Sequence, residues 1–194
     1  MGTELVPWVF TTGWASGINA YATVLVLGLL GRFGDVSAIP PGLTRTDVLI
    51  AAGVLFTLEF VADKIPYVDS LWDAVHTVIR PSIGAVIGGL LAGNDTSLSQ
   101  VFAATSGGAI ALLSHLAKAG LRAAVNTSPE PASNVIVSSG EDITVAGLVA
   151  LVTAHPWLSA GLAALLLTAT VILVVKLWRR VLAFRSRWRG RWAQ

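Results

Sequence analysis

The sequence predicts an all-α integral membrane protein, a helical bundle of about six membrane segments arranged as two inverted three-segment repeats. The composition is the first observation, because 54% of the residues are hydrophobic and only 12% are charged. Soluble domains carry roughly 25% charged residues. The second observation is a series of long apolar stretches that fit membrane helices. The chain has no cysteine, which excludes disulfides, thiolate metal sites and cysteine nucleophiles.

Six apolar segments make up the predicted bundle. The first is long enough to span a bilayer with tilt, and the last has the most continuous apolar run. The third has so few residues that it would make only about 20 Å of helix, against a hydrocarbon core of about 30 Å. It must therefore re-enter the membrane, or extend back towards Ser70 through a kink at Pro81. The segments are 7–31, 47–62, 81–93, 98–118, 143–156 and 157–177.

Residues 126–142 separate the fourth and fifth segments, and they are rich in residues that form turns. This composition predicts a polar loop outside the membrane. The short apolar run Val135–Val137 would then be a surface strand or part of a packed loop.

A weak internal repeat supports two halves. A shift of 90 residues places Ser16 and Gly17 on Ser106 and Gly107. Each half would contain three segments, and an odd number of crossings per half makes the halves run in opposite directions. The predicted halves are residues 7–93 and 98–177 of a transmembrane domain that covers 1–177. A basic tail, 178–194, follows.

The distribution of basic residues predicts the topology. Seven of the thirteen Lys and Arg residues lie between Lys176 and Arg191, although the net charge of the chain is only +2. Such a cluster, interleaved with tryptophan, is typical of a cytoplasmic segment at an anionic lipid surface and does not indicate nucleic-acid binding. With six crossings, both termini would be cytoplasmic.

Ionisable residues concentrate in an otherwise apolar chain at residues 63–81. Asp69, Asp73, His76 and Arg80 are spaced by 4, 3 and 4 residues, which places them on one face of a helix. That face could be a wet surface at the membrane interface. Alternatively, it could turn inward and pair with other charges.

Two further groups could supply those partners. His115, Lys118 and Arg122 share one helical face, and Glu59 and Asp63 lie four residues apart just upstream of the first stripe. Ionisable groups inside a bilayer cost several kcal/mol unless paired, and they often mark a transport pathway. Glu59 is the strongest case because its neighbours in the sequence are apolar. We expect it to be paired or functional.

The first segment combines Asn19 with small residues. Gly13 and Gly17 have the spacing of a helix-packing motif, as do Gly84 and Gly88 in the third segment. Close helix packing explains these glycines. The alternative around Asn19 is a broken helix whose backbone groups help to line a site.

These features favour a small transport protein or channel that moves an ion, a small solute or an anionic lipid headgroup. Its pathway would lie between Asn19, Glu59 and the two charged stripes. The alternative is a membrane scaffold or accessory subunit that transports nothing. An enzyme is less favoured, because no H-E-x-x-H motif and no phosphate-binding glycine loop is present. We expect a homo-oligomer with no cofactor, no metal and no catalytic residue.

Three blocks of the sequence resemble a family of small bacterial integral membrane proteins classed as a domain of unknown function. The resemblance covers most of residues 10–175 and implies a multi-helix membrane fold, but no activity. The basic tail lies outside it. We expect the protein to lie in the bacterial inner membrane. The blocks are GWASGINAYATVLVLGLLGRFG, EFVADKIPYVDSLWDAVHTVIRPSIGA and HLAKAGLRAAVNTSPEPASN.

Overall fold

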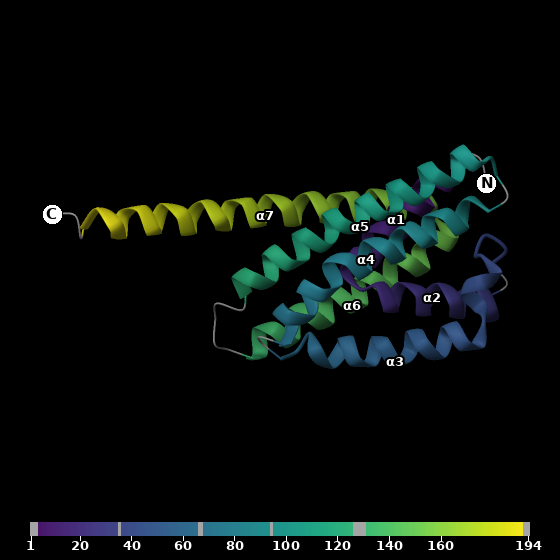
Figure 1. Ribbon diagram of the computed structural model, residues 1–194, viewed down its shortest axis with the longest axis horizontal. Helices are drawn as coiled ribbons and strands as arrows, with labels where there is room; N and C mark the ends of the chain where they lie inside the picture. Colours follow the sequence, from purple (N-terminus) through teal and green to yellow (C-terminus); the bar gives the residue numbers. More distant parts are fainter. Residues whose placement is uncertain (1–3, 35, 66–67, 94, 126–130, 192–194) are drawn as a thin grey trace.

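The computed structural model of the chain is a helical bundle, and the predicted all-α class is confirmed (Figure 1). The structure describes residues 4–34, 36–65, 68–93, 95–125 and 131–191, and it describes no side chains in 124–134 or 181–194. Within these limits it contains helices and one short 3-10 turn but no strand. The elements are α1 (Leu5–Ile18), α2 (Ala20–Phe33), η2 (Pro41–Thr44), α3 (Thr46–Ala62), α4 (Val68–Ala92), α5 (Ser97–Val125), α6 (Pro131–Ala154) and α7 (Pro156–Arg191).

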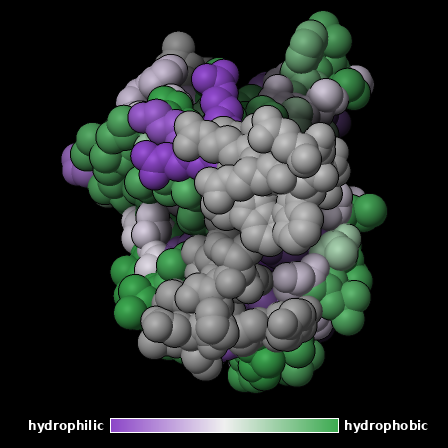
Figure 2. All heavy atoms as spheres, turned by 90° about the vertical axis from the view of Figure 1, so that its left-hand side faces the viewer, coloured by the Kyte–Doolittle hydropathy of each residue, from purple (hydrophilic) through white to green (hydrophobic). Residues whose placement is uncertain are grey.

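The outside of the bundle identifies a membrane protein. Helices α4, α5, α6 and α7 are each long and apolar enough to cross a bilayer. Large apolar side chains face outward along them. For example, Leu71 and Val78 of α4 are 69% and 71% exposed. A soluble protein would bury such a continuous apolar surface, whereas a membrane protein presents it to lipid. Figure 2 looks onto the end from which α7 projects and shows apolar atoms around the edge of the molecule, with hydrophilic atoms in patches between them.

The first predicted segment, 7–31, is not one helix. Asn19 has an extended backbone, with φ −148° and ψ 100°, and it separates α1 from α2. Each of these helices has 14 residues and is about 21 Å long, too short to cross a hydrocarbon core of about 30 Å. The prediction of a single spanning helix was therefore wrong, and the structure shows the alternative, a helix that is broken at Asn19.

Helices α1 and α2 form a hairpin that enters and leaves the bundle at the same end (Figure 1). The Arg32 guanidinium near the end of α2 donates a hydrogen bond of 2.8 Å to the Thr46 hydroxyl at the start of α3. At the tip of the hairpin, the Ile18 carbonyl lies 2.9 Å from the Lys118 ammonium in the second half of α5. The hairpin thus has its tip inside the bundle.

The third predicted segment is the second half of a longer helix. Helix α4 runs without interruption from Val68 through Pro81 to Ala92, which is 25 residues and about 37 Å. Of the two possibilities for residues 81–93, the structure shows the extended helix. The stretch rich in charges is therefore the first half of a membrane helix.

The prediction of a polar loop at residues 126–142 was also wrong for most of that segment. Helix α6 begins at Pro131, so it includes the run Val135–Val137 that we expected in a strand or loop; residues 126–130 lie outside the described part. A helix with this polar composition is stable here because Glu141 and Asp142 bind groups inside the bundle. Tertiary partners have overridden the turn-forming composition.

Helix α7 continues through the predicted boundary between membrane domain and tail. It has 36 residues, about 54 Å, and it projects well beyond the other helices (Figure 1). The basic segment 178–191 is thus a continuation of the last membrane helix.

The structure does not confirm six crossings or inverted repeats. Contacts between α1 and α5 advance in the same direction along both helices, from Gly13 beside Gly107 to Ile18 beside Lys118. Inverted halves would place the corresponding helices α1 and α5 in opposite directions. Because the hairpin makes no net crossing, the start of α1 and the end of α7 lie at opposite ends of the bundle (Figure 1). That placement does not fit the expectation of both termini on one side.

The four glycines of the predicted packing motifs all lie against α5. A β-carbon on Gly17 would lie 2.2 Å from the Ala111 carbonyl oxygen, and one on Gly88 would lie 2.3 Å from that of Ala103. Gly13 and Gly84 both face the backbone of Gly107, so the helices approach with no side chain between them. We call the end where α4 ends and α5 begins the glycine end, and the opposite end, where α3 ends and α4 begins, the charged end.

Candidate functional site: a buried charged cluster at the helix break

The ten polar residues predicted for a pathway are all buried. None exceeds 5% exposure, and five helices bring them together around the tip of the α1–α2 hairpin. Of the two interpretations of the charged stripe on α4, the structure shows the inward orientation. The residues are Asn19, Glu59, Asp63, Asp69, Asp73, His76, Arg80, His115, Lys118 and Arg122.

Arg80 organises one part of the cluster. Its side chain is fully buried, and its two terminal nitrogens bind Glu59 Oε1 at 2.9 Å and Asp73 Oδ1 at 2.9 Å. The nitrogen that binds Asp73 also donates to His115 Nδ1 at 2.8 Å. One guanidinium therefore joins a carboxylate of α3, a carboxylate of α4 and a histidine of α5.

Lys118 and Arg122 organise the second part. The Lys118 ammonium lies 2.7 Å from Asp63 Oδ2 and 3.5 Å from Glu141 Oε2. Arg122 binds the same Glu141 oxygen at 2.8 Å and lies 4.0 Å from Asp69 Oδ1. These contacts tie α5 to the end of α3, the start of α4 and α6. The charged ends of four helices are thus held in one network.

Asp63 follows α3, and its pKa reflects this network. Burial is the largest single effect and pushes the pKa of the Asp63 carboxyl upward, but the charge and hydrogen bond of Lys118 and the charges of Arg80 and Arg122 together outweigh it. The pKa of Asp63 therefore lies below its ordinary value, and this carboxylate is charged at neutral pH.

The helix break places backbone groups in the cluster. The carbonyls of Gly17 and Ile18, at the C-terminal end of α1, accept hydrogen bonds from Arg80 at 3.5 Å and Lys118 at 2.9 Å. A helix C-terminus carries partial negative charge and unsatisfied carbonyls, so these cations compensate both. The break is thus stabilised by the same side chains that form the ion pairs.

Asn19 completes the hairpin tip. Its side-chain oxygen accepts a hydrogen bond of 2.8 Å from the Ala22 amide and so caps the first turn of α2. Its side-chain nitrogen donates to Asp142 Oδ1 of α6 at 2.9 Å. The amide side chain therefore fixes the start of α2 and binds it to α6.

The two histidines of the cluster have different hydrogen-bond partners. An arginine can only donate, so His115 Nδ1 must accept from Arg80, and the ring proton sits on Nε2, 3.0 Å from the Thr77 hydroxyl. His76 Nδ1 lies 2.8 Å from the Trp72 carbonyl and must donate to it, while Nε2 lies 3.0 Å from the Tyr21 hydroxyl. The hydroxyl can donate or accept. His115 is therefore held neutral, whereas His76 keeps both hydrogen bonds in either charge state.

The sequence analysis missed four residues of the site. Glu141 and Asp142 lay in the segment that we assigned to a loop, so their pairing with Arg122 and Asn19 was not foreseen. The signal was available, since an acidic pair precedes an apolar run in which a helix could begin. Tyr21 and Thr77 gave no comparable signal, because a single hydroxyl in a membrane segment is ordinary.

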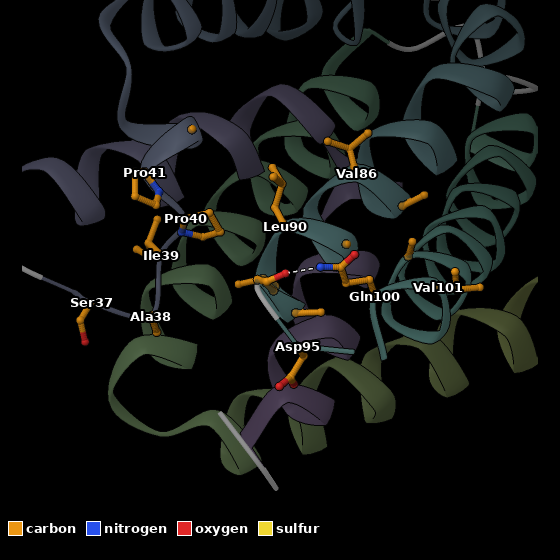
Figure 3. Close-up of a pocket in the computed structure, with 17 residues that line it drawn as sticks. Ser37, Ala38, Ile39, Pro40, Pro41, Val86, Leu90, Asp95, Gln100 and Val101 are labelled. Carbon is orange, nitrogen blue, oxygen red and sulfur yellow. Dashed lines mark hydrogen bonds between the residues drawn. The ribbon is translucent and has the colours of Figure 1, made fainter. Parts of the chain in front are cut away.

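A separate hollow of about 1150 Å³ lies at the glycine end, away from the cluster (Figure 3). The segment 37–42, the last turns of α4 and the first turns of α5 surround it. Its labelled side chains are mostly apolar, and Gln100 donates a hydrogen bond to the Gly93 carbonyl at its edge. The charged residues of the cluster do not reach this hollow.

A family match covers most of the chain and all of the cluster. The family described as "Domain of unknown function (DUF4126)" matches residues 7–176. The chain belongs to this family. The resemblance seen in the three sequence blocks is thus confirmed, and the basic end of α7 lies beyond the matched DUF4126 region. No curated protein and no solved structure matches the chain.

Proposed function

We propose that this protein is a small membrane transporter or channel, and that the charged cluster at the hairpin tip is its ion or solute site. The observation that carries the proposal is the coincidence of a broken membrane helix with ten buried polar residues. Broken helices at membrane depth are tolerated where they lie within protein or line a cavity. Transporters use the ends of such half-helices to bind substrates and coupling ions.

Polar atoms without partners support a binding role. Glu59 Oε2, Asp73 Oδ2 and Ser16 Oγ are buried and have no hydrogen-bond partner among the described residues. Nearly all buried polar atoms in proteins are hydrogen-bonded, and a purely structural network would satisfy them. A binding site for a polar ligand requires polar atoms that are free to form hydrogen bonds, and these oxygens lie beside the hairpin tip.

The proposed topology has five crossing helices, α3 to α7, and one hairpin. Basic residues gather at the charged end, where Lys64 lies, and at the same end of the bundle α7 projects with its basic segment (Figure 1). The positive-inside rule then places the charged end and the C-terminus in the cytoplasm of a bacterial inner membrane. The α1–α2 hairpin enters from the outside, and its tip meets the cluster in the cytoplasmic half.

A scaffold or accessory subunit is the alternative, and one observation favours it. Arg80, Lys118 and Arg122 each have ion-pair partners, so the cluster could simply lock the helices together. The projecting basic end of α7 would then bind anionic lipid headgroups or another copy of the chain. This alternative predicts a folded protein with no permeation, so transport assays separate the two.

Reconstitution into liposomes tests the proposal. The probes are protons, potassium, inorganic phosphate and glycerol, each followed by a dye or by vesicle swelling. We expect at least one flux to exceed that of protein-free liposomes, to fall at least tenfold in Glu59→Gln and to persist in Asp95→Asn, whose carboxylate lies at the glycine end. A folded wild-type protein that moves none of these probes would favour the scaffold.

A further inference from the structure

The charges of the cluster do not balance. Among the described residues, six carboxylates surround only three cationic side chains, and Lys64 lies at the margin with its ammonium 3.0 Å from the Phe60 carbonyl. Uncompensated charge at membrane depth is costly, so such a site favours uptake of positive charge. The carboxylates are Glu59, Asp63, Asp69, Asp73, Glu141 and Asp142; the cations are Arg80, Lys118 and Arg122.

The excess is most sharply located at Arg80. One guanidinium serves two carboxylates, and the side chains of Glu59 and Asp73 are only 0% and 6% exposed. Each carboxylate binds Arg80 through one oxygen, and its second oxygen, Glu59 Oε2 or Asp73 Oδ2, has no partner in the described part of the chain. The pair therefore has one negative charge too many and two open acceptor atoms.

Of the two histidines beside this pair, one is held neutral and the other can be neutral or charged, so neither fixes a balancing positive charge. His115 accepts from Arg80 and is held neutral by that bond. His76 is the one neighbour whose partners permit either charge state. The other ionisable groups that face the cluster are Tyr21 of α2, Asp63 and Lys64 after α3, Asp69 of α4, Lys118 and Arg122 of α5, and Glu141 and Asp142 of α6.

We propose that Glu59 and Asp73 share one exchangeable proton across Arg80, and that the proton is the transported or coupling ion of this protein. The inference rests on the proposed transport function and narrows its substrate class to a cation. A proton needs a single open carboxylate oxygen. A metal ion needs several ligands, and the described residues contain no group of three or more acidic, histidine or cysteine side chains placed to hold one.

The loading step is simple. A hydronium ion gives its proton to an open carboxylate oxygen, an O–H bond forms, and water is left. The Asp73 side chain is slightly exposed whereas that of Glu59 is not, so Asp73 receives the proton first. Transfer to Glu59 breaks the O–H bond on Asp73 and forms one on Glu59. Release reverses the step, with the O–H bond breaking and water accepting the proton. Two carboxylates that compete for one cation hold a proton between them because both cannot be compensated at once.

Infrared difference spectroscopy of the whole protein in lipid tests the inference directly. A protonated buried carboxyl has its own carbonyl stretching band, which should appear and disappear as the pH is changed. We expect this band in the wild type, its loss or a shift in Glu59→Gln and Asp73→Asn, and no change in Asp95→Asn. Size-exclusion chromatography and circular dichroism establish that each variant is folded.

A measurement without substitution keeps the test independent of folding. The chain has only four glutamates, so carbon-13 labelling of glutamate shifts the band if Glu59 holds the proton. A band that ignores both glutamate and aspartate labelling, or no band at any pH, would overturn the inference. A spectral change that follows sodium or potassium against choline at constant pH would replace the proton by an alkali cation and would also overturn it.

The outcomes separate this inference from the proposed function. A titrating carboxyl band with no flux of any probe would leave the proton site standing and remove transport. Flux of phosphate or glycerol that is independent of pH, with no carboxyl band, would keep transport and remove the proton. Proton flux in liposomes together with the band would support both.

Discussion

The two ends of this bundle hold their helices together by opposite means. At the charged end, Arg80, Lys118 and Arg122 join four helices through buried ion pairs. At the glycine end, α4 lies against α5 with no side chain between Gly88 and the Ala103 backbone. The same pair of helices, α4 and α5, takes part in both contacts. One pair of helices is thus held by ion pairs at one end and by close backbone packing at the other.

The difference lies in what each end tolerates. Small residues let backbones approach in lipid, where no hydrophobic driving force favours association of apolar helices. Such a contact requires only the absence of a side chain. A buried ion pair requires both partners, because either one alone is an uncompensated charge. Substitutions that add a side chain should therefore destabilise the glycine end, and substitutions that remove a charged side chain should destabilise the charged end.

The largest expected effect is an all-or-none difference in cysteine labelling between the two ends of the bundle. Because α1 and α2 form a hairpin, Glu4→Cys and Ser37→Cys should both label from outside, whereas Ile65→Cys should label only after permeabilisation. The chain has no native cysteine, so each label reports one position. Intact cells and a membrane-impermeant maleimide provide the measurement.

The contrary result is equally clear. A single spanning helix over 7–31 would place Glu4 and Ser37 on opposite sides, so labelling of only one of them from outside would contradict the hairpin. Labelling of all three from outside would reverse the assignment of the charged end.

Arg80→Ala should give the largest loss of stability. It leaves Glu59 and Asp73 as buried carboxylates without a cation, and breaking a buried pair in this way costs about 3–5 kcal/mol. Reversible unfolding in mixed detergent measures the free energy. The control is Arg45→Ala, which removes an exposed pair with Asp47 and should leave the stability unchanged. Equal stability of the two variants would mean that the charged end is wet.

Gly88→Ala should destabilise the glycine end by less, about 1–3 kcal/mol, since overpacking of a close contact has this order of effect. Its β-carbon would lie 2.3 Å from the Ala103 carbonyl oxygen, which belongs to backbone and cannot rotate away. Gly147→Ala of α6 is the matched control, because nothing lies within 4 Å of its β-carbon position. The same unfolding assay decides, and a neutral Gly88→Ala would show that α4 and α5 are not held by this contact.

The smallest effect is a pH dependence at the charged end. The pKa of Asp63 is lowered in the folded protein, so the unfolded chain binds more protons as the pH falls. The stabilisation by Asp63 is fully present above its unfolded pKa of about 3.9 and is lost as the pH falls through the lower folded value. The free energy of unfolding should therefore decrease in acid. Its dependence on pH should be weaker in Asp63→Asn than in the wild type.

The sequence predicted the charged face well because spacing carries that information. Asp69, Asp73, His76 and Arg80 recur at helical intervals, which places them on one helical face. The spacing left open whether that face meets water or turns inward, and the structure shows the inward orientation. The sequence could not show which charges pair, because Arg80 and Arg122 are chemically alike. Their partners follow from how the helices are packed together.

A broken helix around Asn19 was only the alternative in the sequence analysis, and the hairpin was not foreseen for a different reason. Residues 7–31 include polar residues around Asn19 but no charge and no proline after the first position, so the composition does not require a break there. The break is stable because Arg80 and Lys118 bind the carbonyls that it frees. Those partners are separated from Asn19 by more than sixty residues in the sequence. The start of α6 was missed likewise, since Glu141 and Asp142 are compensated only in the assembled bundle.

The one-residue break also has a mechanical consequence. Asn19 supplies the only backbone torsions between α1 and α2 that no helix restrains, and both neighbours are helical. Helix α2 is thus a lever about 21 Å long pivoting at one residue. A rotation of about 10° at the pivot would move the far end of α2 by about 4 Å. Any change in the charges that hold the pivot is thereby magnified at the opposite end of the membrane, where Arg32 meets the start of α3.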